Sequence, residues 1–248
     1  MSSARLSQAT LFASRVAPKR KAGVENSVEP KRPKPAETPR QAKPAEAQQL
    51  HRGLNTLSKG CEVIYEPVAV ADPGKRFADL QKKVNWLQKE ITVMGRKVMQ
   101  PREIAYMADN GLRYTYSKTQ LEPEAFPTEV QDIKNQVERL ANARFNCCLL
   151  NHYRDGKDNL GWHSDNEKLF GPKPTIASVS LGARRDFVLR RNSDHSQKWK
   201  CSLGEGDILI MKGRTQSDWM HSIPKRSSCG PRINLTFRRI VEEEAAQN

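Results

Sequence analysis

The stretch RINLTFR, residues Arg232–Arg238, alternates polar and apolar residues without a break. Successive side chains of a β-strand point to opposite faces, so this alternation predicts a strand with one apolar and one polar face. Ile233, Leu235 and Phe237 would then pack in a core. The polar face, which carries an arginine at each end, would look the same on a solvent-exposed strand. It could instead bind an anion, because guanidinium groups bind carboxylates in a bidentate manner.

Four more runs of strand-like sequence lie upstream, separated by Gly, Pro and charged residues. They are FNCCLLNHY (145–153), TIASVSLG (175–182), DFVLR (186–190) and DILIMK (207–212). Two earlier segments, 77–91 and 127–140, space their apolar residues at helical intervals instead. Helices followed by many short strands predict an α+β domain, in which helices lie outside a β-sandwich or jelly roll.

The N-terminal part of the chain has a different composition. Residues 1–50 hold six of the fifteen prolines and a single aromatic residue, Phe12. Such a segment buries too little apolar area to offset chain entropy, so we expect a disordered basic tail. The expected boundaries are a tail over residues 1–58, one domain over 59–241 and a C-terminal tail over 242–248.

The tail contains two basic clusters, Lys19-Arg20 and Lys31–Lys34, with ten residues between them. This is the layout of a two-cluster nuclear import signal, which predicts an import receptor as a partner and the nucleus as the location. A solvated basic arm that holds phosphate without specificity is the alternative. Residues 8–14, QATLFAS, match part of a sliding-clamp-binding peptide, but Ser14 and Arg15 stand where its aromatic pair belongs.

Composition limits the classes of partner. The net charge of +14, from 42 Lys+Arg against 28 Asp+Glu, favours polyanions such as nucleic acid or an anionic membrane. No apolar run approaches the ~18–20 residues that span a bilayer, so no membrane is expected. The five cysteines show no C-x-x-C spacing, which argues against a zinc ribbon or redox pair. We expect a monomer.

The segment GWHSDNE (161–167) raises the question of a metal site. It places His163 and Asp165 two residues apart, so an extended backbone would project both toward one ion. Alone, the pair could equally be two polar side chains in a loop. An iron site of two histidines and one carboxylate needs a second histidine.

His221 is the remaining candidate for that second histidine, because the other three have unsuitable surroundings. His51 lies in the expected tail, His195 lies in a polar stretch, and His152 faces away from Asn151 and Tyr153. The candidate triad is therefore His163, Asp165 and His221. Asn151 and Tyr153 share a strand face, and with the two arginines of 232–238 they describe a pocket for a dicarboxylate beside a metal.

These motifs together resemble the AlkB family of Fe(II)- and 2-oxoglutarate-dependent dioxygenases. The resemblance covers about residues 100–240 and is most specific in TQSDWMHSIPK (215–225) and PRINLTFR (231–238). It is closest to the eukaryotic branch that repairs nucleic acids. It implies a double-stranded β-helix, or jelly roll, with supporting N-terminal helices, which agrees with the strand-rich half of the chain.

The resemblance also implies roles and a reaction. His163, Asp165 and His221 would bind Fe(II), and six residues would contact the cosubstrate 2-oxoglutarate: Asn151, Tyr153, Arg232, Asn234, Thr236 and Arg238. The implied reaction uses O2 to demethylate 1-methyladenine and 3-methylcytosine in DNA, and releases formaldehyde and succinate. Loss of formaldehyde needs no protein base, which fits the absence of a recognisable catalytic dyad or triad of the hydrolase type.

The implied substrate site must accept a base flipped from a duplex or presented on a single strand. Tyr114 and Tyr116, two apart, could offer aromatic faces, although both could instead be core residues of a hairpin. The resemblance assigns eight residues to substrate binding: Met94, Gly95, Arg96, Tyr114, Tyr116, Ser117, Asn166 and Glu167. Two depart from the family pattern, since relatives carry an aromatic residue at position 94 and often an aspartate at 166.

Three other functions remain open at this stage. An RNA demethylase of the same family would carry the same motifs. A zinc hydrolase could use the same triad, but it would not need two arginines for a dicarboxylate. A damage-binding protein without activity would be expected to lack a metal ligand, and the three candidates are all present.

Overall fold

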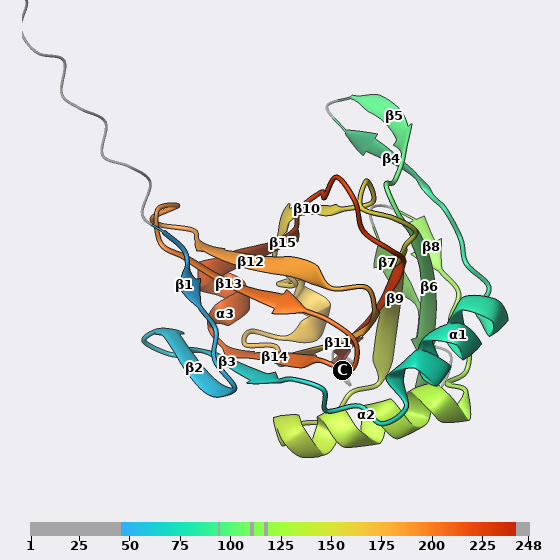
Figure 1. The fold of residues 1–248 in the computed structure, drawn as a ribbon, viewed down its shortest axis with the longest axis horizontal. Coiled ribbons are helices and arrows are strands. Elements are labelled where there is room, and N and C mark those ends of the chain that lie inside the picture. The colour runs from blue at the N-terminus through green and yellow to red at the C-terminus, as the bar shows by residue number, and fades with distance from the viewer. Residues whose placement is uncertain (1–45, 94, 110–111, 117–118, 242–248) are drawn as a thin grey trace, which may run out of the picture. The chain divides into compact units, whose positions relative to one another are not determined.

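The computed structural model describes residues 46–93, 95–109, 112–116 and 119–241, which all fall in one unit of the chain, residues 43–248. Two facing β-sheets form a jelly-roll core, as predicted (Figure 1). One sheet has seven strands in the order β2 (Gly53–Ser58), β3 (Cys61–Glu66), β14 (Ile208–Gly213), β11 (Ile176–Gly182), β16 (Arg232–Arg238), β9 (Cys147–Tyr153) and β6 (Glu103–Ala108). The other has five, in the order β1 (Gln48–Gln49), β13 (Lys198–Leu203), β12 (Arg185–Arg191), β15 (Trp219–Ile223) and β10 (Leu160–His163).

Two hairpins and three α-helices complete the described fold. The hairpins are β4 (Glu90–Val93) with β5 (Arg96–Met99), and β7 (Tyr114–Tyr116) with β8 (Thr119–Leu121). The helices are α1 (Pro73–Lys83), α2 (Thr128–Ala141) and the short α3 (Thr215–Asp218). In Figure 1, α1 and α2 lie along the outer side of the seven-stranded sheet, and the β4–β5 hairpin projects away from both sheets.

Strand β16 is the RINLTFR stretch, and it lies between β11 and β9 near the middle of the large sheet. Its apolar residues Ile233, Leu235 and Phe237 are fully buried in the core that packs against α1 and α2, as the alternation predicts. The polar face is buried too, since Arg232 and Arg238 are 0% and 4% exposed. The solvent-exposed alternative is therefore wrong, because this face lies between the two sheets.

The helical pattern over residues 77–91 is interrupted in the structure. Helix α1 ends at Lys83, and Val84 has extended backbone angles. Leu87 instead pairs with Ile104 of β6, and Ile91 belongs to β4. Strand pairing thus replaces the last turns of the predicted helix. The second helix, α2, forms where the spacing predicts it.

The expected end of the N-terminal tail at residue 58 is wrong for residues 48–58. Strand β1 extends the small sheet by pairing with β13, and β2 forms the edge of the large sheet beside β3. Leu50 and Leu57 are buried in the core between the sheets. Few apolar side chains are enough to hold this segment in the fold, because its backbone also forms hydrogen bonds with β13 and β3. The import signal, segment 8–14 and the tail 242–248 lie outside the described residues.

Candidate active site

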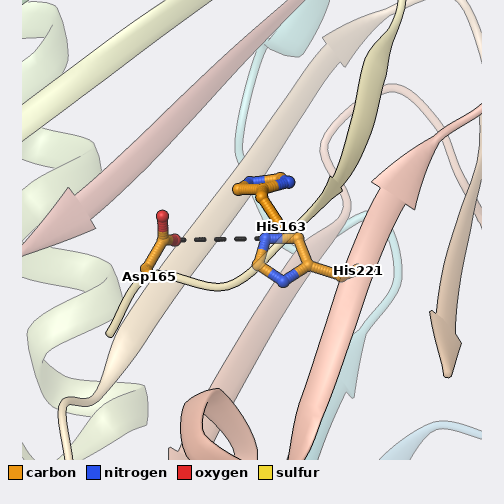
Figure 2. A group of neighbouring side chains, drawn as sticks. All are labelled: His163, Asp165 and His221. Carbon is orange, nitrogen blue, oxygen red and sulfur yellow. Dashed lines mark ion pairs between the residues drawn. The ribbon is translucent and has the colours of Figure 1, made fainter. Parts of the chain in front are cut away.

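The three predicted metal ligands converge at one end of the small sheet. His163 ends β10 and pairs directly with His221 of β15, and Asp165 follows in the next loop. One ligand atom from each residue lies within 4.8 Å of the others, and Figure 2 shows the three side chains facing one another. His163 Nδ1 lies 2.9 Å from the Gly161 carbonyl oxygen. A carbonyl can only accept, so Nδ1 carries the proton and the Nε2 lone pair is available to a metal.

Asp165 is held as a carboxylate with one oxygen available. Arg238 donates from Nη2 to Oδ1 at 2.8 Å, and Oδ2 lies 4.0 Å from Nε2 of His221. Burial alone would raise the pKa of Asp165, but the positive charge of Arg238 and the adjacent histidines lower it to about 2. Among the described residues, Oδ2 has no hydrogen-bond partner although it is buried.

His221 has the electronic state that a metal ligand requires. Burial, reinforced by the nearby His163, lowers the pKa of His221 to about 3, so its imidazole is neutral at physiological pH. The neutral imidazole of His221, the Nε2 lone pair of His163 and the carboxylate of Asp165, whose buried Oδ2 has no hydrogen-bond partner among the described residues, fit a divalent iron site with two histidines and one carboxylate. We conclude that the residues present fit the metal that the resemblance implies.

Gln216 fixes the loop that carries Asp165, and sequence reasoning missed it. Its Oε1 accepts a hydrogen bond from the Asp165 backbone N–H at 2.9 Å, while its Nε2 lies 3.1 Å from Met211 Sδ. Gln216 belongs to α3 and is 1% exposed. No local pattern marks it, because its partner lies 51 residues away in the chain.

Beside the triad, Arg232 and Tyr153 present polar atoms that lack partners. Arg232 donates from Nη2 to Ser180 Oγ at 2.8 Å, but its Nε and Nη1, and the Tyr153 hydroxyl, have none among the described residues. The Arg232 guanidinium carbon lies 5.2 Å from the centre of the Tyr153 ring. Burial lowers the pKa of Arg232 from its ordinary value. An anionic group could accept hydrogen bonds from these buried donors of Arg232 and Tyr153.

A cavity joins the two sets of residues. Its lining consists of Arg102, Leu149, Asn151, Tyr153, Leu160, His163, Asp165, Ser178, Phe187, Met211, His221, Ile223, Asn234, Thr236 and Arg238. Arg232 adjoins it through Tyr153. The lining combines the metal ligands with five of the six residues predicted to contact the cosubstrate, so the structure brings that predicted set together.

The two amide side chains that line the cavity, Asn151 and Asn234, differ in their hydrogen-bond partners. Arg102 was not assigned to this cavity from the sequence. Its Nε donates to Asn151 Oδ1 at 2.6 Å, so the amide nitrogen of Asn151 is the atom that can donate to a ligand. Asn234 donates to Ser178 Oγ at 2.8 Å and to the Val179 carbonyl at 3.0 Å. Its Oδ1 accepts from Thr236 at 3.2 Å. Asn234 therefore links β16 to β11, Thr236 orients Asn234 within β16, and both residues line the cavity.

The residues predicted to bind substrate are only partly described. Tyr114 is 3% exposed, and its ring packs against Tyr106 and Phe170 with centroid distances of 5.6 and 5.7 Å. It therefore offers no open face for stacking. Burial raises the pKa of Tyr114, so the phenol stays protonated and donates to Glu167 Oε1 at 2.9 Å. Glu167 itself is exposed.

The other predicted substrate residues lie on exposed segments or outside the described part of the chain. Asn166 is exposed beside Glu167. Gly95 has a φ of +78° at the turn between β4 and β5, and Arg96 is exposed at the start of β5. Met94, Ser117 and the side chain of Tyr116 lie outside the described residues.

Comparison with known proteins gives a consistent result. The family model of the 2OG-Fe(II) oxygenase superfamily matches residues 60–238. DNA oxidative demethylase ALKBH2 of Arabidopsis thaliana is 37% identical over 192 residues, 66% of this chain and 61% of the relative. Alpha-ketoglutarate-dependent dioxygenase alkB homolog 3 of Bos taurus is 40% identical, over 67% of this chain and 61% of the relative. Human ALKBH2 is 35% identical, over 69% of this chain and 70% of the relative.

Solved structures support the fold. The structure titled OsALKBH1 superimposes with a TM-score of 0.53 at 18% identity, covering 75% of this chain and 99% of that one. No helix in the described part of the chain has the length and apolar character needed to cross a membrane. The matched region spans about three fifths of the Arabidopsis and bovine relatives. The chain belongs to the 2OG-Fe(II) oxygenase superfamily, whose cofactors are Fe(II) and 2-oxoglutarate, and within it to the AlkB family.

Proposed function

We propose that this protein is an oxidative demethylase that repairs 1-methyladenine and 3-methylcytosine in DNA, with Fe(II), 2-oxoglutarate and O2, and that it releases formaldehyde and succinate. The observation that carries the proposal is the shared cavity, where unpartnered metal-binding atoms adjoin unpartnered donors for a carboxylate. Two of the relatives are named as DNA oxidative demethylases.

The metal-binding residues are proposed to act as a preorganised set. His221 would present a neutral imidazole and His163 its Nε2 lone pair, while Arg238 keeps Asp165 ionised and fixes its Oδ1 so that Oδ2 points to the metal. When bound, Fe(II) and 2-oxoglutarate would activate O2 for the oxidation of an N-methyl group to an N-hydroxymethyl group; one oxygen atom of O2 goes to the methyl carbon and the other to succinate, as the cosubstrate loses CO2. That product loses formaldehyde when its hydroxyl proton is lost and the C–N bond breaks, so no protein nucleophile is required.

The cosubstrate residues are proposed to bind its two ends separately. Arg232 and Tyr153, with three unpartnered donor positions, would bind the carboxylate remote from the metal. The Asn151 amide nitrogen, oriented by Arg102, would donate to the end nearer the metal, close to Arg238. Asn234 and Thr236 would form the floor beneath the ligand, since their polar atoms already bond within the sheet.

The proposed substrate contacts centre on Glu167. Tyr114 holds one oxygen of this exposed carboxylate, which leaves the other to accept a hydrogen bond from an exocyclic amine of the damaged base. Arg96 on the projecting β4–β5 hairpin would contact strand phosphates, and Gly95 would permit its turn. Tyr116, Ser117, Met94 and Asn166 remain predicted contacts of the base or its flanking nucleotides.

The location and partners of the protein belong to the same proposal. A DNA substrate and the two basic clusters at Lys19-Arg20 and Lys31–Lys34 support nuclear action through an import receptor. Deleting residues 1–45 from a fluorescently tagged chain should abolish nuclear accumulation, and accumulation unchanged by the deletion would contradict the assignment.

The catalytic proposal is tested with the purified chain, Fe(II), 2-oxoglutarate and O2. Matched single-stranded DNA, duplex DNA and RNA oligonucleotides, each with and without one methylated base, are incubated with the protein, and repaired base, formaldehyde and succinate are measured. We expect equal amounts of all three products on methylated DNA and none with Asp165→Asn. Repair without 2-oxoglutarate, or equal turnover by Asp165→Asn, would refute the proposal. Faster turnover on RNA would favour the RNA demethylase.

A further inference from the structure

The outer face of the five-stranded sheet carries an exposed tryptophan directly beside a metal ligand. The register of β10 against β15 is irregular between Leu160 and His163, and the Trp162 side chain contacts Arg190, which lies on the face of the sheet opposite the triad. Trp162 is 37% exposed and is one of the exposed large apolar side chains in the described part of the chain, whereas tryptophan is highly buried on average. A large aromatic side chain at this position therefore needs an explanation other than core packing.

Trp162 is in contact with an arginine from a strand two places away in the sheet. The guanidinium carbon of Arg190 lies 4.2 Å from the centre of the Trp162 ring, and its Nη2 lies 3.8 Å from Sδ of Met220 on the intervening strand β15. Among the described residues, Arg190 Nε has no hydrogen-bond partner. The three side chains thus form a continuous aromatic and cationic surface across β10, β15 and β12.

The positive charge continues on the next strand. Arg190 pairs across the sheet with Lys198 of β13, and Lys200 lies on the same face two residues further on. Directly opposed like charges destabilise a sheet. Within the described part of the chain, none of the three cations forms an ion pair, and the acid on this face, Asp186, is paired with Arg226.

We propose that Trp162, Arg190, Lys198 and Lys200, here called the Trp162 platform, bind the nucleic-acid strand that flanks the target base. An unstacked base would pack on the exposed surface of Trp162, and the three cations would contact successive phosphates. Aromatic side chains that accept bases, combined with a positive surface along the backbone, are how proteins bind single strands without sequence preference. The inference rests on the proposed function and extends it to nucleotides outside the catalytic cavity.

The dimensions of the sheet set the length of this contact. Four adjacent strands, from β10 through β15 and β12 to β13, span three spacings of about 4.8 Å, or about 14 Å. One nucleic-acid strand advances about 3.4 Å per nucleotide when stacked. The platform therefore corresponds to about four nucleotides on one side of the target base. A trinucleotide centred on that base would reach at most the Trp162 end.

The test compares affinities for long and short ligands. Full-length protein with Mn(II) and 2-oxoglutarate, kept free of oxygen, is titrated with a methylated trinucleotide and with single strands extended by six nucleotides on the 5′ or the 3′ side. Variants are Trp162→Ala, Trp162→Phe and the double variant Lys198→Gln/Lys200→Gln. The control is Lys75→Gln, which removes one exposed charge on α1 that pairs with Asp79. Mn(II) affinity is measured for each variant, because Trp162 adjoins His163.

We expect Trp162→Ala to lower the ratio of long-strand to trinucleotide affinity by about tenfold, and Trp162→Phe to restore most of it. The double lysine variant should reduce the slope of log affinity against log salt by about 1.4, at about 0.7 per phosphate contact on a single strand. A loss of affinity for only one of the two extended strands would show whether the platform binds nucleotides on the 5′ or the 3′ side of the target base.

Three results would overturn the platform. The first is a ratio of long-strand to trinucleotide affinity that is unchanged in all variants. The second is a fall in this ratio no larger than that of Lys75→Gln, and the third is a fall that occurs only in variants that bind Mn(II) more weakly. Turnover by the unaltered chain is measured on the same oligonucleotides. Platform-dependent binding without turnover would refute the proposed function and leave the platform standing.

Discussion

Replacing Arg232 by methionine should separate cosubstrate binding from stability. Arg232 is fully buried at the start of β16, and it uses only Nη2 within the protein, to Ser180. Two of its nitrogens have no partner among the described residues. Methionine fills a similar volume with a flexible apolar chain and carries no charge. The substitution thus removes both the proposed carboxylate donor and the cost of its burial.

The two effects have opposite signs. Removing one member of a buried, hydrogen-bonded charge pair costs about 2–5 kcal/mol of binding free energy, so the dissociation constant for 2-oxoglutarate should rise about 30-fold or more. A buried donor without a partner costs about 1–3 kcal/mol. The ligand-free variant should therefore be at least as stable as the unaltered protein, with a Tm that is unchanged or higher by about 2–4 °C.

The assay is calorimetric titration with 2-oxoglutarate in the presence of Mn(II) and the absence of oxygen, together with thermal unfolding with and without the ligand. The unaltered protein should show a rise in Tm with 2-oxoglutarate that Arg232→Met lacks. Arg144→Met is the matched control, because the side chain of that arginine is 81% exposed and, among the described residues, forms an ion pair with Glu138 alone. A dissociation constant within threefold of the unaltered value would refute the role of Arg232. A ligand-free Tm lowered by more than 4 °C would refute the reasoning about its burial.

Three further substitutions test the triad, its support and the core. Asp165→Asn leaves Arg238 buried without a counter-charge, so the metal-free protein should lose about 3–5 kcal/mol of unfolding free energy in urea; a loss below 1 kcal/mol would contradict the pairing. Gln216→Leu removes the acceptor of the Asp165 N–H and should weaken Mn(II) binding about 10- to 100-fold, whereas an affinity within twofold would exclude a positioning role. Phe237→Ala should cost about 3–5 kcal/mol by denaturant unfolding, and a cost below 1.5 kcal/mol would show that β16 is not a core strand.

The metal ligands were predictable because their spacing is local. His163 and Asp165 are two residues apart, and His221 remained after the surroundings of the other histidines were considered. His152 was excluded as a metal ligand, and the structure agrees. Its Nδ1 lies 2.8 Å from Oε2 of Glu103, and its ring packs against Trp86, away from the cavity. Period-two alternation thus identified both which strand residues share a face and which do not.

Tertiary pairing decided what local patterns could not. The apolar spacing over residues 77–91 continues past Lys83, but the chain leaves the helix because Leu87 and residues 90–93 pair as strands. Residues 48–58 have a composition similar to that of the preceding segment, yet they pair at the edges of both sheets. A propensity summed over one segment does not include the hydrogen bonds that the segment forms with another strand, whether that strand is nearby, as β5 is for β4, or distant, as β13 is for β1.

The residues that orient the site left no local signal for a related reason. Gln216 acts on Asp165 and Arg102 acts on Asn151, and each pair joins segments 49 or 51 residues apart. Neither orienting residue has a spacing relation to the group it holds. Their roles follow only from which atoms remain unpartnered once the chain has folded.

The two arginines of β16 also differ in their charge partners, which their sequence positions do not indicate. Arg232 and Arg238 stand at opposite ends of one strand face and are equivalent in the sequence. In the structure, Asp165 neutralises Arg238 at 2.8 Å, whereas no carboxylate among the described residues pairs with Arg232, which donates to the Ser180 hydroxyl and lies against the ring of Tyr153. A buried cation without a counter-ion is stable only if an anion joins it. This difference supports the proposal that Arg232 binds the remote carboxylate of the cosubstrate, because Arg238 is already paired with Asp165.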